Sequence, residues 1–192
     1  SILLEKSLKE ENPLPKLRFY SWTGAWLSVG RNQDKFPKNW ASLVKQGKFK
    51  VVRRPTGGGA VLHCGGLTYS LIWPNAPKKR RLAYSLACEW LIKGFSKLGM
   101  HLKHGKEQAI QGSTNCFSSS TSADLIDENG NKRIGSAQLW KFGHLLQHGE
   151  IILAPPNQLW LEIFGECPPE KTPITISKRN LVVLLEETWL SS

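Results

Sequence analysis

The sequence predicts an α+β fold, and three observations support it. Strand-like and helix-like segments follow each other in mixed order rather than in strict alternation, which disfavours a doubly wound parallel sheet. The segment 123–138 is typical of a β-hairpin that turns at Asn-Gly. No internal repeat or linker divides the 192 residues, so we expect a single domain that covers 1–192.

The individual elements follow from local patterns. The strongest helix is predicted at 81–99, where Gly99 ends a run of apolar side chains at helical spacing. That apolar stripe consists of Ala83, Leu86, Ala87, Trp90, Leu91, Phe95 and Leu98. The strand 67–73 alternates, with Thr68 and Ser70 on the face opposite its large apolar residues. Further helices are expected at 2–11, 39–47 and 176–190, and further strands at 16–22, 26–33, 48–54 and 144–153.

Composition narrows the class of protein. The net charge of +11 attracts acidic partners. Basic residues are scattered apart from 77–81 and no nucleic-acid-binding motif is present, so we expect no specific nucleic-acid binding. No apolar run approaches the ~20 residues that cross a bilayer, and the charged first residues do not resemble a signal peptide. The four cysteines include no Cys-x-x-Cys pair and no zinc-type spacing, so we expect a reduced cytoplasmic protein without a metal site or a membrane partner.

Three consecutive glycines lie in the stretch "RRPTGGGAVLHCGG", which begins at Arg53. A P-loop needs a Gly-Lys-Ser/Thr ending, and a dinucleotide fingerprint needs spaced glycines that open a helix; this stretch has neither. Bare amides in a loop between two strands hydrogen-bond an anion, and Arg53 and Arg54 add positive charge. We therefore interpret the loop as a ligand-contacting segment, with a tight connection that binds no ligand as the alternative.

The same stretch carries a resemblance to a known superfamily. "RRPTGGGAVLH" followed by "LTYSL" is similar to the signature of the lipoate-protein ligases, octanoyltransferases and biotin-protein ligases. "LRFYSWTGAWLSVGRNQ", "NCFSSSTSADLI" and "NKRIGSAQLWKFGHLLQHGEIIL" also resemble segments of that superfamily, in the same order. The resemblance covers most of the chain from Leu17 to Leu153, and the cysteine-containing octanoyltransferases that resemble the ligases are the most similar branch.

The resemblance implies an α+β domain with a central mixed or antiparallel sheet flanked by helices, and a site for an octanoyl or lipoyl group. It implies protein lipoylation, with the lysine of an acidic lipoyl domain or of the glycine-cleavage H protein as acceptor. Position by position, it implies that Lys132 and Cys116 are catalytic. The substrate-binding positions that it implies are Arg53, Gly57, Gly58, Gly59, Val61, His63, Gly135, Ser136, Ala137 and His148.

Several of these residues have simpler interpretations. Lys132 follows an Asn-Gly turn, where a lysine is usually solvated. The family pattern has Ile or Val after the lysine, whereas Arg133 stands here; a shifted register would give Arg133 the lysine's role, but the spacing to Gly135 favours Lys132. Without the resemblance Cys116 is a packing or surface residue, and His148 packs or lines the pocket. Cys88 is expected to pack beside the 81–99 helix.

Two reactions fit the resemblance. A transferase takes octanoate from acyl carrier protein through a Cys116 thioester without a cofactor, and a nearby ammonium such as Lys132 stabilises the thiolate. A ligase uses ATP and Mg²⁺ to form a lipoyl-adenylate. About 40 residues follow 149–153, too few for an accessory C-terminal domain, and this favours the transferase. A non-catalytic acyl- or protein-binding module and a basic nucleic-acid binder are the more distant alternatives.

Overall fold

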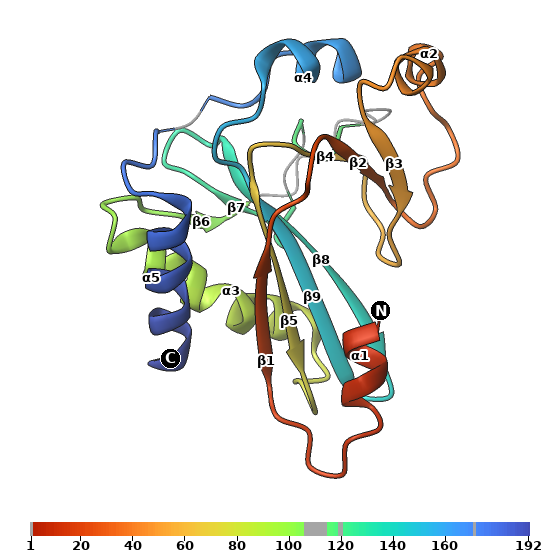
Figure 1. Cartoon of the computed structure of the whole chain (residues 1–192). Helices are drawn as coiled ribbons and strands as arrows, with labels where there is room; N and C mark the ends of the chain where they lie inside the picture. The colour runs from red at the N-terminus through yellow and green to blue at the C-terminus, as the bar shows by residue number, and fades with distance from the viewer. Residues whose placement is uncertain (1, 106–114, 119–120, 171) are drawn as a thin grey trace.

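The computed structural model describes residues 2–105, 115–118, 121–170 and 172–192, which form two sheets and the helices around them (Figure 1). The larger sheet has six strands, and every neighbouring pair in it is antiparallel. In spatial order these strands are β1 (Lys16–Tyr20), β5 (Leu67–Trp73), β9 (His144–Ile151), β8 (Lys132–Lys141), β7 (Leu125–Ile126) and β6 (Lys103–His104). The α+β expectation is confirmed.

The smaller sheet has three strands and is mixed. Its central strand β2 (Trp26–Val29) runs parallel to β3 (Lys50–Arg53) and antiparallel to β4 (Val61–His63). The sequence segments of β1 and β2 are separated by five residues, yet the two strands enter different sheets, because β1 pairs with β5. The glycine stretch connects β3 to β4 and therefore belongs to the smaller sheet.

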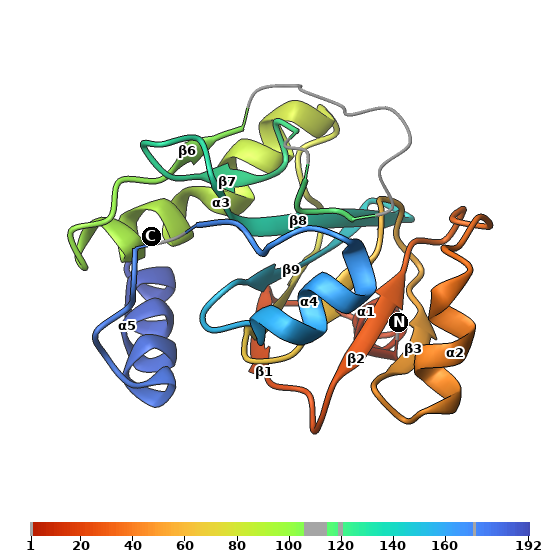
Figure 2. The same cartoon turned by 90° about the horizontal axis from the view of Figure 1, so that it is seen from above.

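The helices cover the two sheets on different sides (Figure 2). They are α1 (Ile2–Ser7), α2 (Asn39–Lys45), α3 (Arg80–Ser96), α4 (Asn157–Phe164) and α5 (Lys178–Leu190). One hydrophobic core joins α3 and α5 to one face of the large sheet, and a second core joins α2 and α4 to the smaller sheet. None of the helices within the described ranges is long and apolar enough to cross a bilayer.

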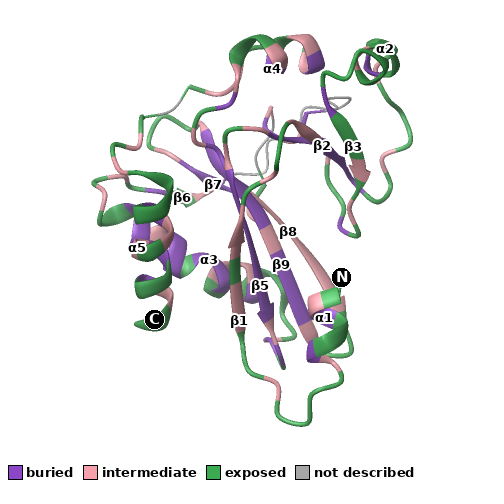
Figure 3. Ribbon diagram, in the orientation of Figure 1, coloured by how far each residue is buried: buried purple, intermediate pink, exposed green. Residues whose placement is uncertain are grey.

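The alternation of β5 produces a sheet with two different faces. Leu67 and Tyr69 pack into the core under α3 and α5, whereas Thr68 and Ser70 point to the opposite face. All residues of β5 except the last are nevertheless buried, as Figure 3 shows. The polar face is therefore enclosed by other parts of the chain, and it is there that the candidate site lies.

Most of the local predictions are confirmed. The hairpin turns between β7 and β8, with Gly130 in the left-handed region at φ 85°. The Ser177 hydroxyl caps α5 by accepting a hydrogen bond from the Asn180 N–H at 3.2 Å. Leu86 is 37% exposed, so its place in the predicted apolar stripe of α3 was wrong. Helix α4 was not predicted, because its eight residues contain no charged first turn or polar cap.

Leu91→Ala should lower the free energy of unfolding by about 2–5 kcal/mol, because the side chain is fully buried between α3 and the large sheet. Leu86→Ala on the same helix is the matched control and should cost less than about 1 kcal/mol. Urea unfolding measures both. Equal losses would contradict the buried face assigned to α3.

Candidate active site

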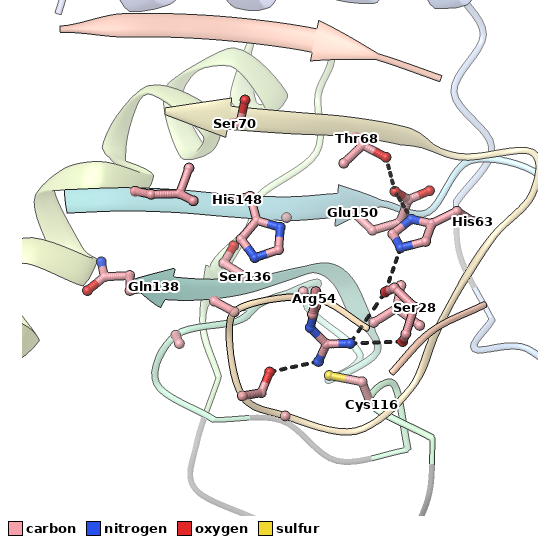
Figure 4. A pocket seen from close by; sticks show the side chains of 18 of the residues that line it. Ser28, Arg54, His63, Thr68, Ser70, Cys116, Ser136, Gln138, His148 and Glu150 are labelled. Carbon is pink, nitrogen blue, oxygen red and sulfur yellow. Dashed lines mark hydrogen bonds and ion pairs between the residues drawn. The ribbon is translucent and has the colours of Figure 1, made fainter. Parts of the chain in front are cut away.

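A cavity of about 610 Å³ lies between the two sheets. Polar side chains of the large sheet form its floor: Arg18, Tyr20, Thr68, Ser70, Gln138, His148 and Glu150. Ser28 of β2, His63 of β4 and the loop between β3 and β4 form the opposite side (Figure 4). Cys116 and Lys132, the first residue of β8, also line the cavity. The glycine loop therefore faces a space large enough for a ligand of substantial size.

Arg54 holds the glycine loop in shape. Its Nη2 donates hydrogen bonds to the carbonyl oxygens of Gly57 and Gly59, both at 2.7 Å. Its Nη1 donates to the Ser28 carbonyl at 2.9 Å, which joins the loop to β2. Burial lowers the pKa of Arg54, and the Cys116 sulfur opposes that effect. The guanidinium is thus engaged with the backbone and also close enough to Cys116 to interact with it electrostatically.

The loop and β2 approach each other so closely that only glycine fits. A β-carbon at Gly30 would lie 1.9 Å from the Gly58 carbonyl oxygen. A β-carbon at Gly58 would lie 3.0 Å from Arg54 Nη2 and 3.8 Å from Cys116 Sγ, and Gly58 has φ 92°. The Arg54 guanidinium and the Cys116 sulfur therefore both lie beside the position that a side chain at Gly58 would occupy.

Backbone pairing places Cys116 beside this loop. Asn115 forms a parallel bridge with Ala60, and the Cys116 N–H donates to the Ala60 carbonyl at 2.9 Å. The Asn115 side chain accepts from the Phe117 N–H at 2.9 Å, which fixes the turn around the cysteine. The Cys116 side chain is only partly buried and lines the cavity.

Lys132 is buried at the start of β8, with its ammonium beside Cys116. Its Nζ forms an ion pair with Asp124 at 3.0 Å and donates to the Cys116 carbonyl at 2.6 Å. The same Nζ lies 3.6 Å from Cys116 Sγ and 5.0 Å from the centre of the Phe117 ring. The ammonium and the sulfur are therefore neighbours at one end of the cavity, and the thiolate is the nucleophilic form of cysteine.

His148 lies in the centre of the floor and is held neutral. Its Nε2 contacts the Thr56 hydroxyl at 2.7 Å. Burial, together with smaller electrostatic contributions from Arg54 and His63, lowers the pKa of His148 to about 4. His148 is therefore a hydrogen-bonding surface at neutral pH rather than a proton acceptor.

A second buried network lies on the other side of the cavity. The Glu150 carboxylate contacts His63 Nδ1 at 2.8 Å, and His63 Nε2 contacts the Ser28 hydroxyl at 2.8 Å (Figure 4). Trp22 stacks on the His63 ring with a centroid distance of 4.6 Å. Glu150 and His63 are 4% and 7% exposed, so this hydrogen-bonded pair is almost completely removed from solvent.

Comparison with known proteins identifies the family of this chain. The sequence profile of the lipoyl protein ligase A/B catalytic domain matches residues 1–175. The chain belongs to this family. It is 35% identical over 167 residues to the octanoyltransferase LipM of Oceanobacillus iheyensis, a match that covers 84% of this chain and 60% of that protein. The chain thus spans about three fifths of the length of that relative.

Solved structures show the same fold. A T. acidophilum protein that was solved with bound lipoic acid superposes with a TM-score of 0.76 at 19% identity, over 92% of this chain and 71% of that one. A lipoate-protein ligase A bound with ATP gives a TM-score of 0.75 at 18% identity, over 92% of this chain and 72% of that one. The fold expected from the family resemblance is confirmed.

The structure brings nearly all the predicted site residues to one cavity. Its lining includes Lys132, Cys116, Gly57, Gly58, Gly59, Val61, His63, Gly135, Ser136, Ala137 and His148. Arg53 does not line it. Its Nη1 instead donates to the carbonyls of Gly30, Arg31 and Gln33 on the outside of the small sheet. The prediction that Arg53 lies at the ligand site is therefore not supported: Arg54 lines the cavity instead, because the two side chains point to opposite sides of the strand end.

The structure also separates Lys132 from Arg133. Lys132 points into the cavity, whereas the Arg133 guanidinium reaches the Thr172 carbonyl and the Met100 sulfur on the other face of the sheet. Cys88 is buried and contacts the Gln147 amide at 3.3 Å, and burial raises the pKa of its thiol to about 12, which suits the packing role predicted for it.

Sequence reasoning missed Asp124, Ser28 and Glu150. Each is a polar residue within or beside a strand, and no local motif marks it. The alternation of 67–73 offers one signal, since it places Thr68 on the polar face, and Thr68 donates to Glu150 at 2.5 Å.

Acid should destabilise the protein through His148. Between pH 6.5 and about 4 the unfolded chain binds a proton at this position that the folded protein does not bind. The contribution of His148 to the free energy of unfolding is therefore fully present above pH 6.5. It falls by about 3 kcal/mol as the pH decreases toward 4. Urea unfolding at pH 7.5 and 4.5 should show a smaller loss for His148→Gln than for the wild type. His101→Gln, at an exposed histidine, should retain the wild-type loss.

Gly30→Ala should lower the free energy of unfolding by about 1–3 kcal/mol, because its β-carbon would displace the Gly58 carbonyl. Gly57→Ala, in the loop that Gly30 contacts, is the control, since a β-carbon there meets nothing within 4 Å. Chemical denaturation compares the two. A Gly30→Ala protein as stable as Gly57→Ala would contradict the close contact between loop and strand.

Proposed function

We propose that this chain transfers an octanoyl group from acyl carrier protein to the lysine of a lipoyl domain, through a thioester on Cys116. The observation that carries the proposal is the contact between Lys132 Nζ and Cys116 Sγ at 3.6 Å. The similarity to octanoyltransferase LipM, which covers 84% of this chain, supports the same reaction.

In the first half-reaction the Cys116 thiolate attacks the carbonyl carbon of the octanoyl thioester. The new carbon–sulfur bond forms, the bond to the carrier's sulfur breaks, and the carrier leaves as a thiolate that takes a proton from water. Lys132 lies close enough to the sulfur to stabilise both the attacking thiolate and the oxyanion of the tetrahedral intermediate. Asp124 keeps the ammonium in place by pairing with it at 3.0 Å.

In the second half-reaction the amine of the acceptor lysine attacks the Cys116 thioester. The carbon–nitrogen bond of the amide forms, the carbon–sulfur bond breaks, and the departing Cys116 sulfur, beside Lys132, takes the proton that the nitrogen loses. Neither step requires a metal or a nucleotide. The net charge of +11 favours an acidic acceptor, either a lipoyl domain or the glycine-cleavage H protein.

A second reaction is favoured by the same cavity. The ATP-bound lipoate-protein ligase A shares the fold, with a TM-score of 0.75. In an ATP- and Mg²⁺-dependent ligase, Lys132 and the amides of the glycine loop would contact the phosphate of a lipoyl-adenylate. Cys116 would then have no chemical role, and this difference makes the two reactions separable by experiment.

Octanoyl-acyl carrier protein, this protein and a lipoyl domain should together yield a lipoyl domain heavier by one octanoyl group, without ATP. Intact-mass spectrometry measures the product. Cys116→Ser should abolish it, and Lys132→Met should slow it by at least about 100-fold because the thiolate loses its cation.

Cys88→Ser is the matched control, because this buried cysteine lies outside the cavity lining and should leave transfer intact. A lipoyl domain that is modified only when lipoate, ATP and Mg²⁺ are supplied would reject the transferase and establish the ligase.

A further inference from the structure

Glu150 is a buried carboxylate, and one of its two oxygens, Oε2, takes part in hydrogen bonds with neighbouring side chains. Its Oε2 accepts hydrogen bonds from the Thr68 hydroxyl at 2.5 Å and contacts His63 Nδ1 at 2.8 Å. Among the described residues, no donor forms a hydrogen bond with Oε1. This oxygen lies against Gly66, where a β-carbon would approach it to 2.0 Å. Glycine at that position therefore leaves room for the carboxylate, which lines the cavity.

The hydrogen bonds around Glu150 have fixed directions. Arg54 and Trp22 can only donate, Arg54 to the Ser28 hydroxyl at 3.3 Å and Trp22 to the Thr68 hydroxyl at 2.9 Å. The Thr68 hydroxyl then donates to Glu150, and the Ser28 hydroxyl to His63 Nε2. We assign to His63 the tautomer that carries its proton on Nδ1, because each hydrogen bond of this network then has one donor and one acceptor. Glu150 accepts from both sides, which is the arrangement that an ionised carboxylate requires.

Glu150 and the reacting sulfur line the same cavity. In the large sheet Glu150 lies directly opposite Gly135, so side chains at both positions point to the same face. A β-carbon at Gly135 would lie 3.1 Å from Lys132 Cε and from the Phe117 ring, and 3.6 Å from Lys132 Nζ. The Lys132 side chain therefore lies over Gly135, on the same face of the sheet as Glu150 and in the neighbouring strand.

The second half-reaction needs a negative group in this position. An acceptor lysine arrives as an ammonium, since its ordinary pKa is about 10.4, but only the free amine attacks a thioester. Lys132 and Arg54 beside the sulfur repel that ammonium. In the described part of the chain, Asp124 and Glu150 are the carboxylates that line the cavity, and Asp124 is engaged with Lys132.

We propose that Glu150 is the catalytic residue that receives the acceptor lysine, an inference that rests on the transfer reaction proposed above. Its Oε1 pairs with the incoming ammonium, and the Glu150–His63 pair accepts one proton and passes it to solvent. The free amine attacks the thioester carbon, the carbon–sulfur bond breaks, and the second proton of the nitrogen goes to the departing Cys116 sulfur. The products are the amide, the Cys116 thiol and one released proton.

The test separates the two half-reactions in Glu150→Gln, which keeps the size of the side chain and removes its charge. Octanoyl-acyl carrier protein alone should load Cys116 in the variant as in the wild type, measured as a mass increase of the protein. Addition of a lipoyl domain should then discharge the thioester about 100-fold more slowly in the variant. Hydroxylamine, whose nitrogen is uncharged at neutral pH, should discharge both proteins at the same rate.

Two further variants exclude a merely structural effect. Glu150→Asp keeps the charge and should recover a substantial part of the discharge rate. Glu186→Gln removes an exposed carboxylate from α5, on the other side of the large sheet, and should match the wild type. Thermal unfolding establishes that each variant is folded at the assay temperature.

The outcomes distinguish this inference from the reaction on which it rests. Equal discharge of Glu150→Gln and wild type by the lipoyl domain would overturn the role of Glu150 while leaving the transferase intact. If Glu150→Gln slowed discharge by hydroxylamine as much as discharge by the lipoyl domain, the role of Glu150 would also be overturned, because an uncharged nucleophile does not need a carboxylate to bind it or to remove its proton. A wild-type protein that never forms the thioester would reject the transferase itself, and the role of Glu150 with it.

Discussion

The ion pair between Lys132 and Asp124 is the interaction on which the site depends. A buried ammonium is tolerated only with a partner and satisfied hydrogen bonds, and Lys132 has Asp124 at 3.0 Å and the Cys116 carbonyl at 2.6 Å. Because β8 begins at Lys132, the large sheet fixes the position of this ammonium. Lys132 also holds the segment that carries Cys116, since its ammonium donates to the Cys116 carbonyl and lies close to the Cys116 sulfur. One buried charge therefore organises a strand and a loop into a reactive centre.

Glycines at four places make that centre accessible. Gly30 and Gly58 allow β2 and the loop after β3 to touch, Gly66 leaves room for the Glu150 carboxylate, and Gly135 leaves room for the Lys132 side chain and the Phe117 ring. In each case an added β-carbon would meet an atom of the site at 3.1 Å or less. Glycine is used here less for chain flexibility than for removing side-chain volume between groups that must approach one another.

The sequence predicted the secondary-structure elements better than the contacts between residues that lie far apart in the chain. The alternation in β5, the Asn-Gly turn before β8 and the Ser177 cap are local signals, and each predicted its structure. Which of Arg53 and Arg54 faces the cavity depends on the orientation of β3 in the small sheet, which no local pattern reveals. The Glu150–His63 pair joins residues 87 positions apart, so only the assembled sheets bring it into existence. The family resemblance located Lys132 and Cys116, but their contact is a property of the fold.

The charges in the cavity are arranged in a way that suits two substrates of different character. Two cations, Lys132 and Arg54, lie beside the Cys116 sulfur, where the proposed transfer would form a thiolate and an oxyanion. Glu150 lies opposite Gly135 in the next strand of the sheet. In the proposed transfer a neutral acyl thioester would meet the cationic side, and a cationic amine would be attracted to the anionic side. Because Glu150 and Lys132 lie on different strands and do not pair with each other, a single small cavity would stabilise an anion and bind a cation in successive steps.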